Sequence, residues 1–79
     1  MNGKGKLLYK DGKIYEGGFI CDKKNGYGVQ KWPDSKIYEG NWFNGLQHGK
    51  GILTDTKGYI REGVWNNGEH IHWINQYEM

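Results

Sequence analysis

A 23-residue repeat constrains the fold of this chain more than any other feature of its sequence. The Gly-x-Gly pattern of residues 3–5 recurs at 26–28 and 49–51, and the x-Glu-Gly pattern of residues 15–17 recurs at 38–40 and 61–63. A fixed period of this length indicates stacked copies of one supersecondary unit. The sequence therefore predicts a single domain, residues 1–79, with units at about 3–25, 26–48 and 49–71 and a tail, 72–79, that departs from the pattern.

Within each unit the sequence alternates with a period of two, which is typical of β-strands. In residues 37–42 the pattern places Tyr38, Gly40 and Trp42 on one face and the intervening residues on the other. Glycine recurs too often for a helix interior. Gly12 suits a hairpin turn that needs a positive φ, and a three-residue loop there would set Leu7 beside Tyr15. Ser35 takes the place of Gly12 in the second unit, where we expect a different turn.

The predicted fold is all-β: an elongated, single-layer antiparallel meander of three tandem hairpins with a C-terminal capping segment. Six strands follow from the three units, and residues 72–77 are a candidate seventh. The aromatic residues would form a ladder across the strands, because the glycines between them leave bare backbone on which a neighbouring ring can lie. A single sheet would leave one side of this ladder open.

Composition narrows the function classes. The net charge is only +2, from eleven Lys and Arg against nine Asp and Glu scattered along the chain, which argues against a nucleic-acid partner. A single cysteine, Cys21, excludes an internal disulfide framework and favours a reducing compartment. No stretch approaches the roughly 18 apolar residues of a spanning helix, and the N-terminus lacks the apolar region of a signal peptide. We therefore expect a cytoplasmic protein.

The run of residues 38–51, Tyr-Glu-Gly-Asn-Trp-Phe-Asn-Gly-Leu-Gln-His-Gly-Lys-Gly, resembles the MORN repeat (membrane occupation and recognition nexus) almost without gaps. The first and third units match less fully: Phe19 replaces the Trp, Asn25 replaces the His, and Arg61 replaces the Tyr. In the tail, His72 and Trp73 stand where a fourth Gly-x-Gly would begin. The resemblance covers nearly the whole chain.

The resemblance implies a non-catalytic role. MORN repeats occur in axonemal radial-spoke proteins, junctophilins, plant phosphoinositide kinases, parasite cytoskeletal proteins and myosin-binding adaptors, mostly as spacers or docking surfaces. A short protein of this kind is similar to a small adaptor or assembly subunit. We therefore expect a protein-binding scaffold in a larger assembly, such as a ciliary axoneme or another cytoskeletal complex, and a location in the cytoplasm, cytoskeleton or cilium.

Two sets of site residues follow from these hypotheses. A helix or extended segment of a protein partner would bind an aromatic groove, using exposed rings as anchors. The predicted groove residues are Tyr15, Phe19, Trp32, Tyr38, Trp42 and Trp65. The alternative is a peripheral module for phosphoinositides or other acidic lipids, with basic contacts at Lys4, Lys6, Lys23 and Lys24.

Other candidates for chemistry are weak in this sequence. Glu16, Glu39 and Glu62 recur once per unit on the face opposite the rings, too far apart to converge as an acid–base pair. His70 and His72 would share one strand face but lack further metal ligands. Cys21 has no partner base, and His48 suits a loop-capping hydrogen bond. We predict no catalytic, cofactor-binding or metal-binding residues.

Overall fold

The computed structural model describes the backbone of residues 2–77 and the side chains of residues 2–74. Within that range the chain forms seven strands and no helix. The strands are β1 (Gly3–Leu8), β2 (Ile14–Ile20), β3 (Lys23–Lys31), β4 (Ile37–Phe43), β5 (Leu46–Thr54), β6 (Ile60–Asn66) and β7 (Glu69–Tyr77). The described residues accordingly contain no helix that could cross a membrane.

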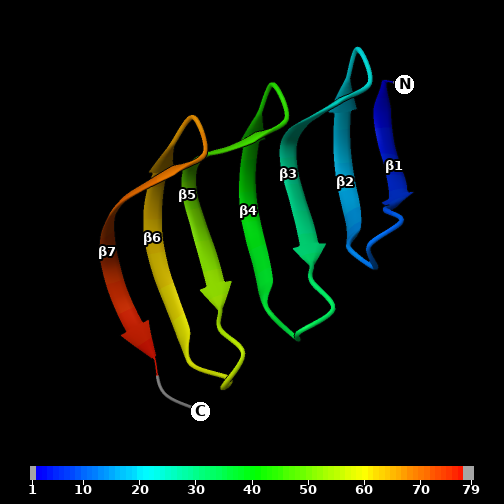
Figure 1. Cartoon of the computed structure of the whole chain (residues 1–79). Coiled ribbons are helices and arrows are strands. Elements are labelled where there is room, and N and C mark those ends of the chain that lie inside the picture. The colour runs from blue at the N-terminus through cyan, green and yellow to red at the C-terminus, as the bar shows by residue number, and fades with distance from the viewer. Residues whose placement is uncertain (1, 78–79) are drawn as a thin grey trace.

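The strands form one open antiparallel sheet in which each strand pairs with its neighbours in sequence, from β1 to β7 (Figure 1). This confirms the predicted all-β meander. The sheet is elongated, with extents of 36 × 24 × 17 Å. Residues 72–77 of the predicted tail lie in β7 and form the candidate seventh strand, which pairs with β6. Trp73 of this strand packs against the end of the aromatic cluster, with its ring centre 5.8 Å from that of Trp65. Residues 78–79 of that tail lie outside the described part of the chain.

Three-residue loops join the strands within each hairpin unit. In the first, the Tyr9 N–H donates to the Lys13 carbonyl at 2.9 Å, and Gly12 has a φ of 99°. This loop sets Leu7 opposite Tyr15, as predicted. Ser35 adopts the same left-handed conformation as Gly12, with a φ of 81°, and its N–H donates to the Trp32 carbonyl at 3.1 Å. The expectation of a different turn at Ser35 was therefore wrong, because the hydrogen bonds of the loop hold the position in spite of its side chain.

Two-residue turns join successive hairpins, at residues 21–22, 44–45 and 67–68. Both residues of each turn have positive φ, from 49° at Asn67 to 87° at Gly68. This is the geometry of type I′ turns, whose twist matches that of the flanking strands. The Asn-Gly pairs of the second and third turns suit it, whereas the first turn places Cys21 and Asp22 in the same conformation.

A second series with the 23-residue step fixes these turns. Asn2, Asn25 and His48 each accept a hydrogen bond from the N–H of the residue 19 positions later. For His48 the acceptor is Nδ1, 3.3 Å from the backbone nitrogen of Asn67. The predicted capping role of His48 is thereby confirmed. Each cap holds the turn that follows a hairpin against the first strand of that hairpin.

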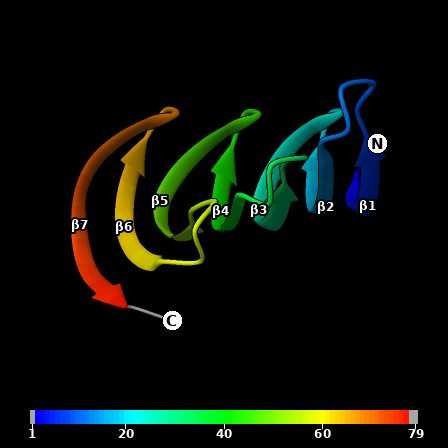
Figure 2. The same cartoon turned by 60° about the horizontal axis from the view of Figure 1, so that its bottom comes forward.

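Bulges curve the sheet at every junction between units. From Gly17 to Phe19 the partner residues on β3 run from Gly28 to Lys24, so two steps on β2 correspond to four on β3. The pairing of β4 with β5 shifts in the same way between Gly40 and Trp42, and β7 carries two smaller shifts against β6. Extra residues of this kind bend the strand that carries them. Figure 2 shows the resulting arcs of β3, β5 and β7.

Candidate functional site

The aromatic ladder lies on the inner side of this curve and forms the core of the protein. Its rings alternate between units in edge-to-face contacts, with centroid separations of 5.2 Å for Tyr15–Phe19, 5.3 Å for Tyr15–Trp42, 5.1 Å for Tyr38–Trp42 and 4.9 Å for Tyr38–Trp65. This is the orientation that aromatic quadrupoles favour. Each of the two tyrosines therefore contacts a ring of its own strand and a ring two strands away.

The hydroxyls of Tyr15 and Tyr38 explain why the strands curve around the rings. Tyr15 donates to the Gly18 carbonyl at 2.9 Å, and Tyr38 donates to the Asn41 carbonyl at 3.0 Å. Three residues of extended strand span about 10 Å, more than a phenol ring can bridge, so the strand must bend toward the ring. Burial raises the pKa of both tyrosines to about 12.

A row of glycines makes room for these rings. Gly5, Gly17, Gly28, Gly40, Gly51 and Gly63 pair in register across six strands. A Cβ added to Gly28 would lie 2.2 Å from the Tyr15 hydroxyl, and one added to Gly51 would lie 2.4 Å from that of Tyr38. The prediction that rings lie on the bare backbone of neighbouring strands is confirmed at these two positions.

The ladder is closed, which corrects the expectation of an open aromatic groove. Tyr15 and Tyr38 are 0% exposed, and Phe19, Trp42 and Trp65 are 5–6% exposed. Of the six predicted groove residues, only Trp32 is half-buried, and the Lys36 ammonium lies 4.5 Å from the centre of its ring. The reason is the curvature: a flat sheet would expose one side of the rings, but these strands wrap around them. A partner could not use the five buried rings as anchors without opening the core.

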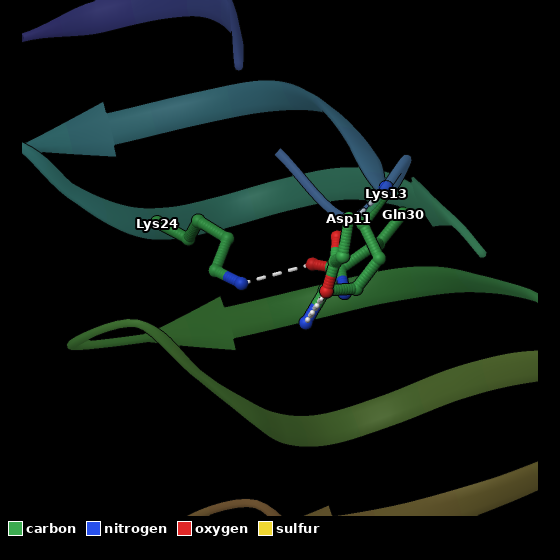
Figure 3. Close-up of polar contacts among 4 residues, drawn as sticks. All are labelled: Asp11, Lys13, Lys24 and Gln30. Atoms are coloured by element: carbon green, nitrogen blue, oxygen red, sulfur yellow. Dashed lines mark hydrogen bonds and ion pairs between the residues drawn. The ribbon is translucent and has the colours of Figure 1, made fainter. Parts of the chain in front are cut away.

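Lys24, one of the predicted lipid contacts, lies against the ladder. Its ammonium is 4.4 Å from the centre of the Trp42 ring and 5.5 Å from those of Tyr9 and Tyr15. It also donates to Gln30 Oε1 at 2.9 Å (Figure 3). A cation held over ring faces and hydrogen-bonded is part of the packing. The Lys24 side chain therefore packs over the aromatic ladder.

The other three predicted lipid contacts lie on the outer face of the sheet. Lys6 pairs with Glu16 and Lys4 with Gly18, both positions that alternate with the inward rings, and Lys23 pairs with Ile20. The four lysines thus do not share one surface. The register also sets Lys6 directly opposite Glu16.

The outer face carries exposed apolar side chains that sequence reasoning did not single out. Their exposed fractions run from 37% for Ile52 to 68% for Leu8. The set is Leu8, Ile20, Tyr27, Phe43, Leu46 and Ile52. The signal was present in the sequence, since these residues alternate with the inward glycines and rings. Alternation alone does not decide which of the two faces is open, because that depends on the curvature of the sheet.

The three periodic glutamates lie on the same outer face and do not converge. Val29 of β3 separates Glu16 from Glu39, and Ile52 of β5 separates Glu39 from Glu62. Glu39 accepts a hydrogen bond from the Tyr27 hydroxyl. This hydrogen bond raises the pKa of Tyr27. These glutamates are therefore surface residues, and no two of their carboxylates point at one place.

His70 and His72 do not share a face, contrary to expectation. The bulge between Val64 and Trp65 sets His70 opposite Trp65 and His72 opposite Val64, so the two imidazoles point to opposite sides. The His70 ring lies 3.9 Å from that of Trp73 and 5.2 Å from that of Trp65, centre to centre. In the described part of the chain, no three His, Cys, Asp or Glu side chains gather as metal ligands.

A comparison with known protein families matches the MORN repeat at residues 1–14, 15–36 and 38–58. No curated protein matches the chain. The second and third matched segments begin at Tyr15 and Tyr38, the two residues at the centre of the buried ladder. MORN repeats occur in scaffolds that bind membranes or proteins, and MORN-repeat proteins are generally non-catalytic. The family matches most of the length of the chain, and the repeats form one hairpin meander. The chain therefore belongs to the MORN-repeat family.

Proposed function

We propose that this chain is a non-catalytic protein-binding scaffold that docks its partner on the outer face of the sheet. The observation that carries the proposal is the contrast between the two faces. The rings are buried within the chain, whereas six large apolar side chains remain on the opposite face at 37–68% exposure. Exposed apolar side chains grouped on one surface of a small protein are typical of interaction sites.

The finer role that we propose is that of a small subunit in a larger assembly, such as a ciliary axoneme or another cytoskeletal complex. The family likeness supports a scaffold in general. An elongated sheet with a continuous face suits contact with a helix or an extended segment. A cytoplasmic, cytoskeletal or ciliary location belongs to the same proposal.

Affinity capture from native cell extract tests the docking face. The variant Ile20→Ser/Tyr27→Ser/Phe43→Ser removes apolar surface from the outer face. The matched control, Leu7→Ser/Tyr59→Ser, removes exposed apolar side chains elsewhere, both of them 40% exposed. We expect defined proteins to bind the wild type and the control and to be lost from the triple variant, with all three proteins folded by circular dichroism. Equal capture by the triple variant would place docking elsewhere.

The second candidate is a module for acidic lipids, supported by three outward lysines, Lys4, Lys6 and Lys23. Binding through lysines depends on charge and should collapse with added salt, whereas apolar docking should respond little. Co-sedimentation with phosphatidylcholine vesicles, with and without phosphatidylserine, separates the two. Salt-sensitive binding to the phosphatidylserine vesicles that is lost in Lys4→Glu/Lys6→Glu would favour the lipid module.

A further inference from the structure

One hollow on the sheet surface differs between the repeats. It has a volume of about 480 Å³ and lies over β1, β2 and β3 near the turn between β2 and β3. Its lining includes backbone at Gly17 and Gly18 and the side chains of Lys4, Ile20 and Tyr27. By strand alternation these three side chains belong to the outer face. Ligand clefts in proteins measure roughly 300–1,000 Å³, so the hollow has room for one large side chain and its flanking backbone.

The residues that open this hollow are particular to the first unit. One repeat later, Asn41 takes the place of Gly18 and Lys50 takes the place of Tyr27. The Asn41 amide donates to the Lys50 carbonyl at 3.3 Å, and the hollow over these two residues measures only about 210 Å³. Val64 takes the same position in the third unit. The hollow is therefore larger in the first unit than in the second.

The walls are apolar, exposed and held in place. Ile20 is 54% exposed and Tyr27 is 59% exposed. The hydrogen bond from the Tyr27 hydroxyl to Glu39 fixes the ring, which lowers the entropy that binding would cost. The side chain of Asn25, another lining residue, accepts a hydrogen bond from the Asn44 N–H and is turned to the repeat junction.

The hollow has one lysine in its lining and lies in the more positive half of the chain. Lys4 is the charged residue of its lining. The surrounding half of the chain, residues 1–36, has eight Lys and four Asp or Glu, a net charge of +4, whereas residues 37–79 have a net charge of −2. A partner that carries a carboxylate beside its apolar group is therefore complementary to this end of the sheet.

We propose, building on the scaffold function, that this hollow receives one aromatic or aliphatic side chain from an extended segment of a partner protein, and that an Asp or Glu beside that side chain pairs with Lys4. The apolar side chain would pack between Ile20 and Tyr27. The carboxylate sets the direction and position of the segment.

Selection of random peptides displayed on phage, with the full chain as bait, tests the proposal. We expect enriched peptides to carry a large apolar residue beside Asp or Glu. Tyr27→Lys, which installs the residue of the second unit, and Lys4→Glu should each weaken the binding of a labelled selected peptide at least about ten-fold. Lys31→Glu makes the same charge change on the same face outside the hollow and should leave the affinity within about two-fold. Circular dichroism checks that each variant is folded.

A charge exchange adds a readout that loss of folding cannot imitate. A selected peptide with Lys in place of its acidic residue should bind wild type weakly and regain affinity for Lys4→Glu. Peptides that bind all variants equally would overturn the hollow and leave the scaffold function standing. The hollow proposal would also fail if no peptide were enriched. If the chain then bound phosphatidylserine vesicles, the scaffold function would be overturned as well.

Discussion

At the scale of single residues, each of the two buried tyrosine rings depends on a glycine of a neighbouring strand. Tyr15 and Tyr38 are buried because Gly28 and Gly51 have no Cβ at the places that the rings occupy. Their hydroxyls are satisfied by backbone carbonyls of their own strands. Burial of a phenol is tolerated when its hydroxyl is hydrogen-bonded, but it favours the neutral form. Packing and protonation are therefore linked in these two residues.

This linkage predicts destabilisation by alkali. In the unfolded chain the tyrosines ionise near pH 10, whereas in the folded protein their pKa is raised to about 12. Their contribution is therefore fully present below pH 10 and is lost as the pH rises toward 12, by about 1.4 kcal/mol per pH unit for each. Urea unfolding across this range should show the decline. Tyr15→Phe/Tyr38→Phe should be less stable near neutrality but should decline less steeply. Ionisation of all tyrosines near pH 10 without unfolding would contradict the prediction.

Gly51→Ala should be strongly destabilising. The new Cβ would lie 2.4–2.5 Å from three atoms of the Tyr38 side chain, which is enclosed and cannot move aside. Overpacking of this kind costs about 1–3 kcal/mol or more. Lys50→Ala, an exposed neighbour on the same strand, should change stability by less than about 0.5 kcal/mol. Thermal unfolding of the two variants would measure the difference, and equal melting temperatures would argue against close packing at Gly51.

At the scale of the elements, turn chemistry and junction caps hold the hairpins in register. Ser35 shows that a loop can impose a left-handed conformation where the sequence lacks glycine. The junction turns are fixed from outside, by the Asn2, Asn25 and His48 series, whose members are acceptors of different chemistry at one structural position. The requirement at that position is therefore an acceptor, which imidazole and carboxamide both provide.

His48→Ala should lower the free energy of unfolding by about 0.5–1.5 kcal/mol, because it leaves the Asn67 N–H without its acceptor. His48→Asn should recover most of this loss, since Asn25 performs the same role through Oδ1 one repeat earlier. Urea titrations of both variants give the comparison. If both substitutions cost the same, the imidazole ring would contribute through packing against Phe43 instead.

At the scale of the whole molecule, the ladder connects the repeats into one unit. Trp42 contacts both central tyrosines, one from its own hairpin and one from the hairpin before. Phe19 contacts Tyr15 at the first rung. A single layer with these contacts has no second sheet to compensate for a lost ring, so stability depends on the continuity of the ladder.

Trp42→Ala should therefore destabilise the protein more than Phe19→Ala does. Removing a buried Trp or Phe costs about 3–5 kcal/mol, against a total stability of about 4–12 kcal/mol for a chain of this length. The central substitution should also abolish the near-ultraviolet circular dichroism of the rings. Equal unfolding midpoints for the two variants would mean that the hairpins unfold independently.

Sequence determined the repeat, the strands and the inward and outward positions, because a period of two inside a period of 23 leaves little freedom to a chain with so many glycines. It also determined that Tyr15, Tyr38 and Trp42 share one face. Tertiary structure alone decided which face is open. The bulges in β3, β5 and β7 depend on pairing between strands, and the curvature they produce buries the ladder. The outer face, with the hollow beside Tyr27, is open as a consequence, because a sheet that curls around its rings presents its other side to solvent.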